Sequence, residues 1–179
     1  MTKANFSAAL RGAVAALSLL ATLSCGEERA TDVLGPSDNA QAAVTPGDLV
    51  ECPTSQTLTT QALVTPLGGT VTLGNTSITI PSGALVLPTL IRITIPASRY
   101  VEVDVTANAL TSFIFNTPVK ITVDYSRCTR TDIDRAPLSV WYIDSATKEP
   151  LQNMGGVDDK VARSVTFETG HLSGYAIAF

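Results

Sequence analysis

Apolar and polar residues alternate one by one along much of this chain, and this two-residue period constrains its fold more than any other feature. In segment 91–95, isoleucine alternates with Arg92 and Thr94, and segment 119–123 has the same pattern. Successive side chains of a strand point to opposite faces of a sheet, so such segments are typical of half-buried strands. No stretch after residue 25 shows a convincing helical period. The chain is therefore predicted to be all-β.

A tight hairpin is predicted near the start of this pattern. Two alternating segments, 71–73 and 78–80, are separated by Gly74 and Asn75, which tolerate the positive φ of a two-residue turn. Pro81 is expected to end the second strand, because proline has no N–H to give to a neighbouring strand.

Turn-rich pieces separate the other predicted strands. Asn116, Thr117 and Pro118 are expected to form a turn between segments 111–115 and 119–123, and residues 126–137 are expected to contain one helical turn. Nine or ten short strands with regular turn signals are typical of an antiparallel β-sandwich. The remaining predicted strands are residues 57–64, 101–105, 138–143, 164–168 and 173–179.

Residues 1–24 have the organisation of a signal peptide. Lys3 and Arg11 form a basic start, and the apolar run 13–23 follows. This run is too short to span the roughly 30 Å of bilayer hydrocarbon as a lasting helix. The segment is expected to be removed when the chain is secreted across the inner membrane.

Residues 21–25 resemble the lipobox of bacterial lipoproteins, in which a cysteine receives a diacylglyceryl group before cleavage ahead of it. Ser24 and Cys25 match this motif, whereas Thr22 replaces the more usual leucine. The resemblance implies lipidation of Cys25 and stable attachment to a membrane. If the cell is Gram-negative, Gly26 stands where an aspartate would signal inner-membrane retention, and the resemblance then favours the outer membrane or cell surface. The alternative is an ordinary secretory signal with an incidental cysteine.

Composition changes after the predicted cleavage site. Residues 25–51 combine acidic residues with alanine, glycine and proline and contain no aromatic residue, which predicts a flexible, disordered tether. Residues 52–179 are expected to form one domain with its own core. Loss of Lys3 and Arg11 leaves 10 basic and 16 acidic residues, a formal charge of −6, which argues against nucleic acid as a partner.

Two cysteines remain after Cys25. Cys52 lies at the start of the predicted domain and Cys128 just after the strand 119–125. An even pair in an oxidising compartment predicts a disulfide, and the alternative is two buried thiols. A zinc site is disfavoured, because it usually takes four cysteine or histidine ligands and the chain has one histidine.

Turn and core residues at 68–71, 78–85, 118–122 and 171–177 resemble those of the ZU-five domain, the sandwich shared by ankyrins, netrin receptors and zonula occludens proteins. The resemblance covers about half of residues 68–179. It implies a β-sandwich that serves as an interaction or scaffolding module, with a binding surface for an unidentified protein or glycan partner at the envelope.

His171, Leu172 and Ser173 are similar to the motif at which some ZU-five domains and related autoproteolytic domains cut themselves. In that chemistry His171 accepts the proton of Ser173, whose Oγ attacks the carbonyl carbon of Leu172, and water then hydrolyses the ester. The alternative is that His171 stabilises a turn while Leu172 packs in the core. We expect the alternative, and the chain has no Gly-x-Ser-x-Gly elbow of a serine hydrolase. The protein is therefore expected not to be an enzyme.

Two further residue pairs allow a functional interpretation. One of Trp141 and Tyr142 must face outward on its strand and could stack on a sugar, although the tryptophan is expected to pack in the core. Asp158 and Asp159 could attract calcium, but they lack the spaced oxygen ligands of a calcium loop and are expected in a polar hairpin turn. No metal or cofactor is expected.

Together these observations predict a lipid-anchored cell-envelope protein with a non-catalytic β-sandwich that binds or scaffolds a partner. The first alternative is an autoproteolytic domain that cleaves itself between Leu172 and Ser173. The second is a glycan-binding module.

Overall fold

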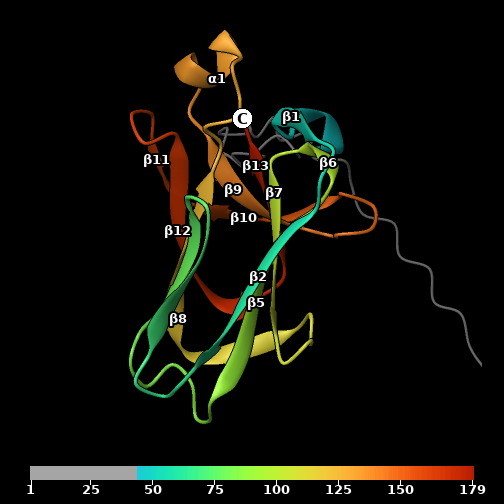
Figure 1. Ribbon diagram of the computed structural model, residues 1–179. Helices are drawn as coiled ribbons and strands as arrows, with labels where there is room; N and C mark the ends of the chain where they lie inside the picture. Colours follow the sequence, from blue (N-terminus) through green and yellow to red (C-terminus); the bar gives the residue numbers. More distant parts are fainter. Residues whose placement is uncertain (1–43) are drawn as a thin grey trace, which may run out of the picture. The chain divides into compact units, whose positions relative to one another are not determined.

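A computed structural model describes residues 44–179 (Figure 1). The predicted signal peptide 1–24, the lipidation site Cys25 and most of the predicted tether 25–51 lie outside the described residues. In order, the elements are η1 (Pro46–Asp48), β1 (Glu51–Thr54), β2 (Leu58–Val64), β3 (Gly69–Leu73), β4 (Thr76–Ile80), β5 (Thr89–Ile95), β6 (Ser98–Tyr100), β7 (Glu102–Ala107), β8 (Phe113–Asp124), α1 (Thr131–Arg135), β9 (Ser139–Ile143), β10 (Pro150–Gly155), β11 (Val157–Asp159), β12 (Ser164–Leu172) and β13 (Gly174–Ala178).

The described part of the chain is an antiparallel β-sandwich, as predicted. One sheet has six strands in the order β10-β9-β13-β7-β5-β2, and the other has five in the order β11-β12-β8-β4-β3. A two-stranded sheet, β1-β6, lies at the upper end in Figure 1. Side chains from the inner faces of the two large sheets form the main core, including Ile78, Ile93, Val103, Ile121 and Tyr175.

The predicted hairpin is confirmed as β3 and β4, with Gly74 at φ 62° in the turn. The structure differs at Pro118, which was expected in a turn but lies inside the single strand β8. Its missing N–H is tolerated because the register between β8 and β12 shifts between Thr169 and His171, where a bulge interrupts the ladder.

The described residues contain thirteen strands rather than nine or ten. The short strands β1, β6, β10 and β11 were not predicted, because Cys52 is the only one of their residues that is buried and they carry no run of apolar core positions. The predicted single helical turn is confirmed as α1, which buries Ile133. No helix within residues 44–179 is long and apolar enough to cross a membrane.

Packing of the domain begins before its predicted boundary at Cys52. Leu49 is 1 % exposed and Val50 is fully buried. Leu49 forms an antiparallel bridge with Ala178, and the Val50 N–H donates to the carbonyl oxygen of Ile177 at 2.8 Å. Residues at the end of the predicted tether therefore pack against the last strand.

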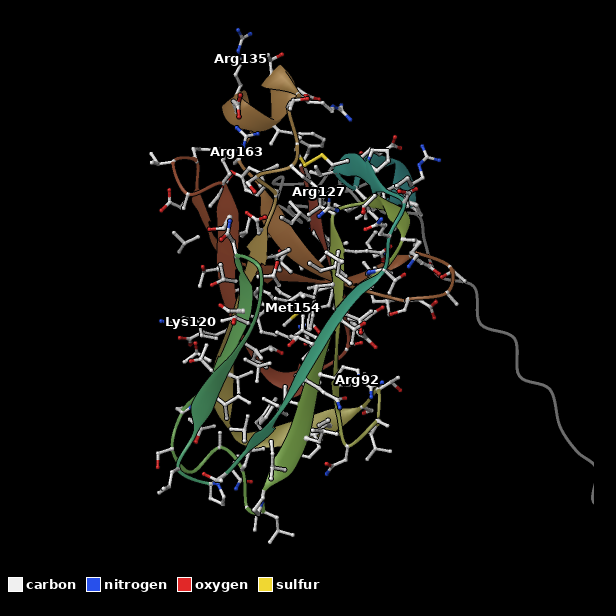
Figure 2. All side chains as sticks on the ribbon, in the orientation of Figure 1. Arg92, Lys120, Arg127, Arg135, Met154 and Arg163 are labelled. Carbon is white, nitrogen blue, oxygen red and sulfur yellow. A yellow bond between two sulfur atoms is a disulfide. The ribbon has the colours of Figure 1, made fainter. Side chains whose placement is uncertain are left out.

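The predicted disulfide between Cys52 and Cys128 is confirmed, with 5.4 Å between the two Cα atoms. Figure 2 shows this bond close to Arg127, whose Nε donates to the carbonyl oxygen of Cys52 at 3.1 Å. The bridge joins β1 to the segment between β8 and α1, across a sequence separation of 76 residues. It therefore closes a long loop around one end of the sandwich.

Candidate functional site

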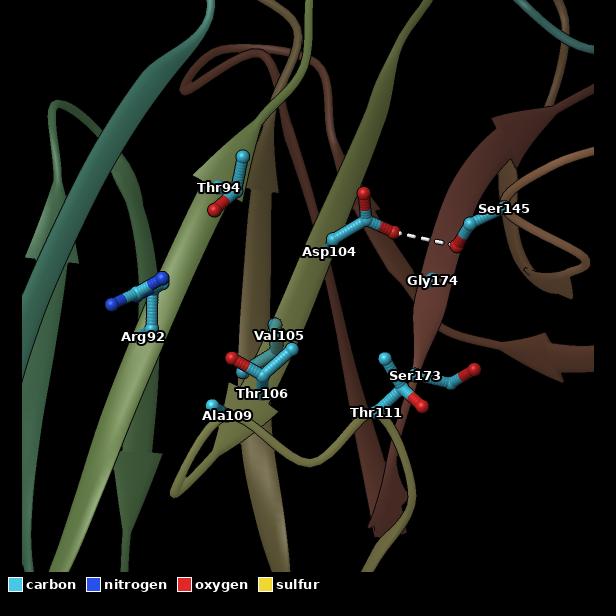
Figure 3. A pocket seen from close by; sticks show the side chains of 10 residues that line it. All are labelled: Arg92, Thr94, Asp104, Val105, Thr106, Ala109, Thr111, Ser145, Ser173 and Gly174. Carbon is cyan, nitrogen blue, oxygen red and sulfur yellow. Dashed lines mark hydrogen bonds between the residues drawn. The ribbon is translucent and has the colours of Figure 1, made fainter.

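A pocket of about 310 Å³ lies on the outer face of the six-stranded sheet (Figure 3). Strand alternation builds it: Val103 and Val105 point into the core, whereas Asp104 and Thr106 on the same strand point outward. Five residues that carry a hydroxyl group, one carboxylate and one arginine are among the lining residues. The lining residues are Arg92, Thr94, Asp104, Val105, Thr106, Ala109, Thr111, Ser145, Ser173 and Gly174.

Sheet register brings these residues together from distant parts of the chain. Thr94 of β5 lies opposite Asp104 of β7, and Asp104 lies opposite Gly174 of β13. Ser145 follows β9, and its Oγ donates to Asp104 Oδ1 at 2.7 Å. The carboxylate is thus held in place by a side chain that reaches across β13.

The contact between Ser145 and Asp104 depends on the small size of Gly174, because a larger residue would occupy the same space. A Cβ atom at position 174 would lie 2.2 Å from Ser145 Oγ and 2.8 Å from Asp104 Oδ1. No φ in the left-handed region is involved at this glycine. The absence of a side chain on β13 therefore allows Ser145 to reach Asp104.

Arg92 does not neutralise this carboxylate. Its Nε and Nη2 atoms donate to Gln61 Oε1 at 3.1 and 2.8 Å, and Figure 3 shows the guanidinium directed away from Asp104. Within residues 44–179, no lysine, arginine or histidine forms an ion pair with Asp104. A carboxylate bordered by Thr94, Thr106 and Ser145 can accept hydrogen bonds from hydroxyl or ammonium groups of a ligand.

His171 and Ser173 lie at the junction of β12 and β13, and the structure separates their side chains. The His171 ring packs against Tyr142 and Tyr175, with ring centroids 5.5 and 6.3 Å away. Ser173 instead lines the pocket on the outer face of the sheet. No hydrogen bond joins the His171 ring to the Ser173 hydroxyl in the described part of the chain. Leu172 is 2 % exposed and packs in the main core.

Tyr175 anchors this junction from β13. Its hydroxyl donates to the His171 carbonyl oxygen at 2.5 Å and lies 3.3 Å from Thr169 Oγ1. Burial raises the pKa of Tyr175 to about 12. The neutral phenol therefore acts as a buried hydrogen-bond donor that fixes the end of β12.

Trp141 and Tyr142 face opposite sides of β9, as alternation predicts. Tyr142 packs against the main core, whereas Trp141 does not. Trp141 is half-buried on the outer face beside Leu49 and Ala176, and its Nε1 donates to Ser139 Oγ at 3.1 Å. The tryptophan is not part of the pocket lining.

Asp158 and Asp159 form hydrogen bonds and an ion pair with neighbouring parts of the fold. Asp158 accepts a hydrogen bond from the Tyr125 hydroxyl at 2.7 Å and pairs with Lys160 at 2.6 Å. Asp159 Oδ1 accepts from the N–H groups of Val161 and Ala162 at 2.9 Å each, which stabilises the turn between β11 and β12. Among residues 44–179, no group of three or more His, Cys, Asp or Glu side chains is arranged to hold a metal ion.

Sequence reasoning did not single out Asp104 or Ser145 as site residues. Alternation in segment 101–105 indicates that Asp104 faces away from the core, but no local signal connects it to Ser145, 41 positions later. Comparison with protein-family models and with curated proteins finds no match to this chain.

Proposed function

We propose that this protein is a lipid-anchored, non-catalytic binding domain of the cell envelope, held on the membrane through Cys25, with its ligand site in the Asp104 pocket. The observation that carries the binding function is the pocket itself. It combines a carboxylate with the hydroxyl groups of Thr94, Thr106 and Ser145 on a rigid sheet face, a donor and acceptor set suited to a small number of oriented polar contacts.

Two features support placement outside the cytoplasm. The first 24 residues have the pattern of an export signal that ends just before Cys25. The Cys52–Cys128 disulfide is typical of chains that fold in an oxidising compartment. The likeness to ZU-five domains agrees with a binding role.

Among envelope ligands, we favour a glycan for this pocket. Sugar hydroxyls both donate and accept, so they can donate to the Asp104 carboxylate and exchange hydrogen bonds with the threonine and serine hydroxyls. The ligand site is thus assigned to Asp104, whereas the aromatic residue Trp141 lies outside the lining. A protein partner with an exposed hydroxyl or lysine side chain is the alternative.

Binding is tested by applying the mature chain, residues 25–179, to an array of envelope saccharides, including peptidoglycan and lipopolysaccharide fragments. Asp104→Asn removes the charge with little change of shape and is expected to weaken binding about tenfold or more, the usual scale for loss of a charged hydrogen-bond acceptor. Glu168→Gln, an exposed carboxylate on β12 of the other sheet, is the matched control and should leave binding unchanged. Equal binding by both variants, or no saccharide bound, would contradict the glycan assignment.

Anchoring is tested separately in a bacterial host. Fractions from cells supplied with labelled palmitate should contain a labelled chain in the membrane, and Cys25→Ser should release an unlabelled chain. A parent chain that is secreted without lipid would refute the anchor but would leave the pocket assignment intact.

A further inference from the structure

Several segments at one end of the sandwich contain no ionisable side chains, although His171 of β12 lies opposite Ile114 in the β8–β12 register. Residues 52–91 and 105–119 contain no Asp, Glu, Lys, Arg or His. The strands β2, β3 and β4 and the starts of β5 and β8 belong to these two ranges. In Figure 2 all labelled basic side chains lie above the lower ends of β2 and β5. Such long uncharged stretches contrast with the acidic character of the chain as a whole.

Two connections and the start of β8 meet at this end and are joined by backbone hydrogen bonds. The Gly83 N–H donates to the Pro66 carbonyl oxygen at 2.9 Å, which links the β4–β5 loop to the β2–β3 turn. The Asn116 N–H donates to the Ala84 carbonyl oxygen at 3.1 Å, which links β8 to the β4–β5 loop. Gly68 fits closely into this arrangement, because a Cβ atom there would lie 2.4 Å from the Ile80 carbonyl oxygen. The two connections and the start of β8 thus form one continuous surface.

Large aliphatic side chains project from this surface, which we call the apolar end. A pocket of about 250 Å³ lies between the β4–β5 loop and β8, and its lining includes Val86, Leu87, Phe113 and Ile114. The exposed aliphatic residues of the apolar end, with their exposed fractions, are Leu63 (65 %), Leu67 (84 %), Val86 (74 %), Leu87 (69 %), Leu110 (58 %) and Ile114 (80 %).

Clustered exposed aliphatic groups of this kind mark an interaction surface, and the absence of charge indicates the partner. Ionised side chains oppose entry into hydrocarbon because they must be desolvated, and none is present in the segments that form the apolar end. The small polar residues beside the aliphatic groups, such as Thr65, Ser82 and Asn116, suit the uncharged part of a headgroup region. A neutral membrane surface therefore matches this end in both polarity and charge.

The length of the preceding chain is compatible with this partner. Residues 26–43 separate Cys25 from the first described residue, and 18 residues reach at most about 65 Å when extended. This argument, unlike the preceding ones, rests on the proposed lipid at Cys25. A chain anchored there could place its apolar end on the same membrane.

We propose that the apolar end inserts into the interfacial region of a lipid bilayer, so that the domain lies against the membrane with a contact independent of lipid charge. Leu67, Leu87 and Ile114 come from the three joined segments and would enter the boundary between headgroups and acyl chains. Insertion of this kind derives its affinity from buried apolar area.

The test uses the mature chain, residues 25–179, with Cys25→Ser, so that no acyl chain contributes. We expect this chain to float with vesicles of pure phosphatidylcholine, and binding should persist at about 1 M salt, where the Debye length is only about 3 Å. Leu67→Ser, Leu87→Ser and Ile114→Ser should each weaken binding about tenfold, and the triple variant should not bind.

The matched control removes exposed aliphatic groups elsewhere. Val157 and Val161, 74 % and 96 % exposed at the β11–β12 hairpin, are replaced together by serine, and vesicle binding should not change. Thermal unfolding confirms that every variant keeps the parent fold.

Three results would overturn the proposal. One is no binding to the neutral vesicles, including the case in which the chain self-associates through the same residues. Another is binding that disappears in high salt, and the third is equal binding by the triple variant and its control. The palmitate experiment reports on Cys25 alone, so failure of the anchor and failure of insertion are distinguishable.

Discussion

Lys148 covers the buried carboxylate of Glu102, with 2.6 Å between Nζ and Oε2. Glu102 points out of β7 on the same face as Asp104 but is only 2 % exposed. Within residues 44–179 its second oxygen, Oε1, has no hydrogen-bond partner. Lys148 has a positive φ of 64° in the connection between β9 and β10. The turn conformation thus places the ammonium group over a carboxylate that forms no other close ion pair within residues 44–179.

We predict that Lys148→Met lowers the free energy of unfolding by about 2–4 kcal/mol, because it leaves Glu102 buried and unpaired. Replacing both residues, as Glu102→Gln with Lys148→Met, should recover at least half of that loss. Urea unfolding at pH 7 measures both values. A loss below about 0.5 kcal/mol would show that the pair behaves like an exposed ion pair.

Gly174→Ala is predicted to lower the free energy of unfolding by about 1–3 kcal/mol and to disturb the pocket. The added Cβ would lie 2.2 Å from Ser145 Oγ, which forces side chains or backbone to move. Ser145→Ala in the same chain should recover part of the loss, because it removes the nearest clashing atom. Calorimetry gives the stability, and the saccharide array reports on the pocket. An unchanged unfolding temperature for Gly174→Ala would contradict the close packing at this position.

Removal of the disulfide is predicted to lower the free energy of unfolding by roughly 4 kcal/mol, since it frees a loop of 76 residues in the unfolded chain. The change is Cys52→Ala together with Cys128→Ala, measured by guanidinium unfolding. Reduction of the parent chain should have a similar effect. Val161→Ala, at a fully exposed turn position, is the control and should have no measurable effect.

Stability is predicted to fall as the pH rises above about 10. The pKa of Tyr175 is raised from its ordinary value of 10.0 to about 12 in the folded chain, so between these values the unfolded chain has lost the proton that the folded chain keeps. The contribution of Tyr175 is therefore complete below pH 10 and is lost as the pH rises towards 12. Burial and the hydrogen bond to Asp158 also raise the pKa of Tyr125, which acts in the same direction.

Tyr175→Phe separates these contributions. It should cost about 1 kcal/mol at pH 8, where the hydrogen bond to the His171 carbonyl oxygen is lost. It should also reduce the slope of stability against pH between 10 and 12 while leaving the part due to Tyr125. Denaturant unfolding at pH 8 and pH 11 measures both effects. A slope identical to that of the parent chain would contradict the raised pKa.

The chain is predicted to remain in one piece at the junction of β12 and β13. The His171 ring packs on Tyr142 and Tyr175 while Ser173 faces the pocket on the other side of the sheet. Intact mass measured under denaturing conditions should give a single species that ends at Phe179. A chain that ends at Leu172, and that disappears in Ser173→Ala, would instead show self-cleavage.

Short-range patterns in the sequence were sufficient to predict the local elements. Alternation in segment 91–95 and the Gly74 turn are short-range signals, so β5 and the β3–β4 hairpin followed directly from them. Two cysteines left after Cys25 were enough to pair Cys52 with Cys128. These features depend on neighbours along the chain, or on simple counting.

The features that join distant segments followed from how the strands pack and pair in the folded chain. A two-residue period assigns side chains to two faces, but it does not say which strand lies next to which or what covers each face. Asp104 became a site residue only when β13 placed Gly174 beside it and left room for Ser145. In the same way, β8 continues past Pro118 because a bulge interrupts its pairing with β12 at that point. The apolar end required two connections and the start of β8 to meet at one end of the sandwich, because strand pairing is a non-local property of the folded chain.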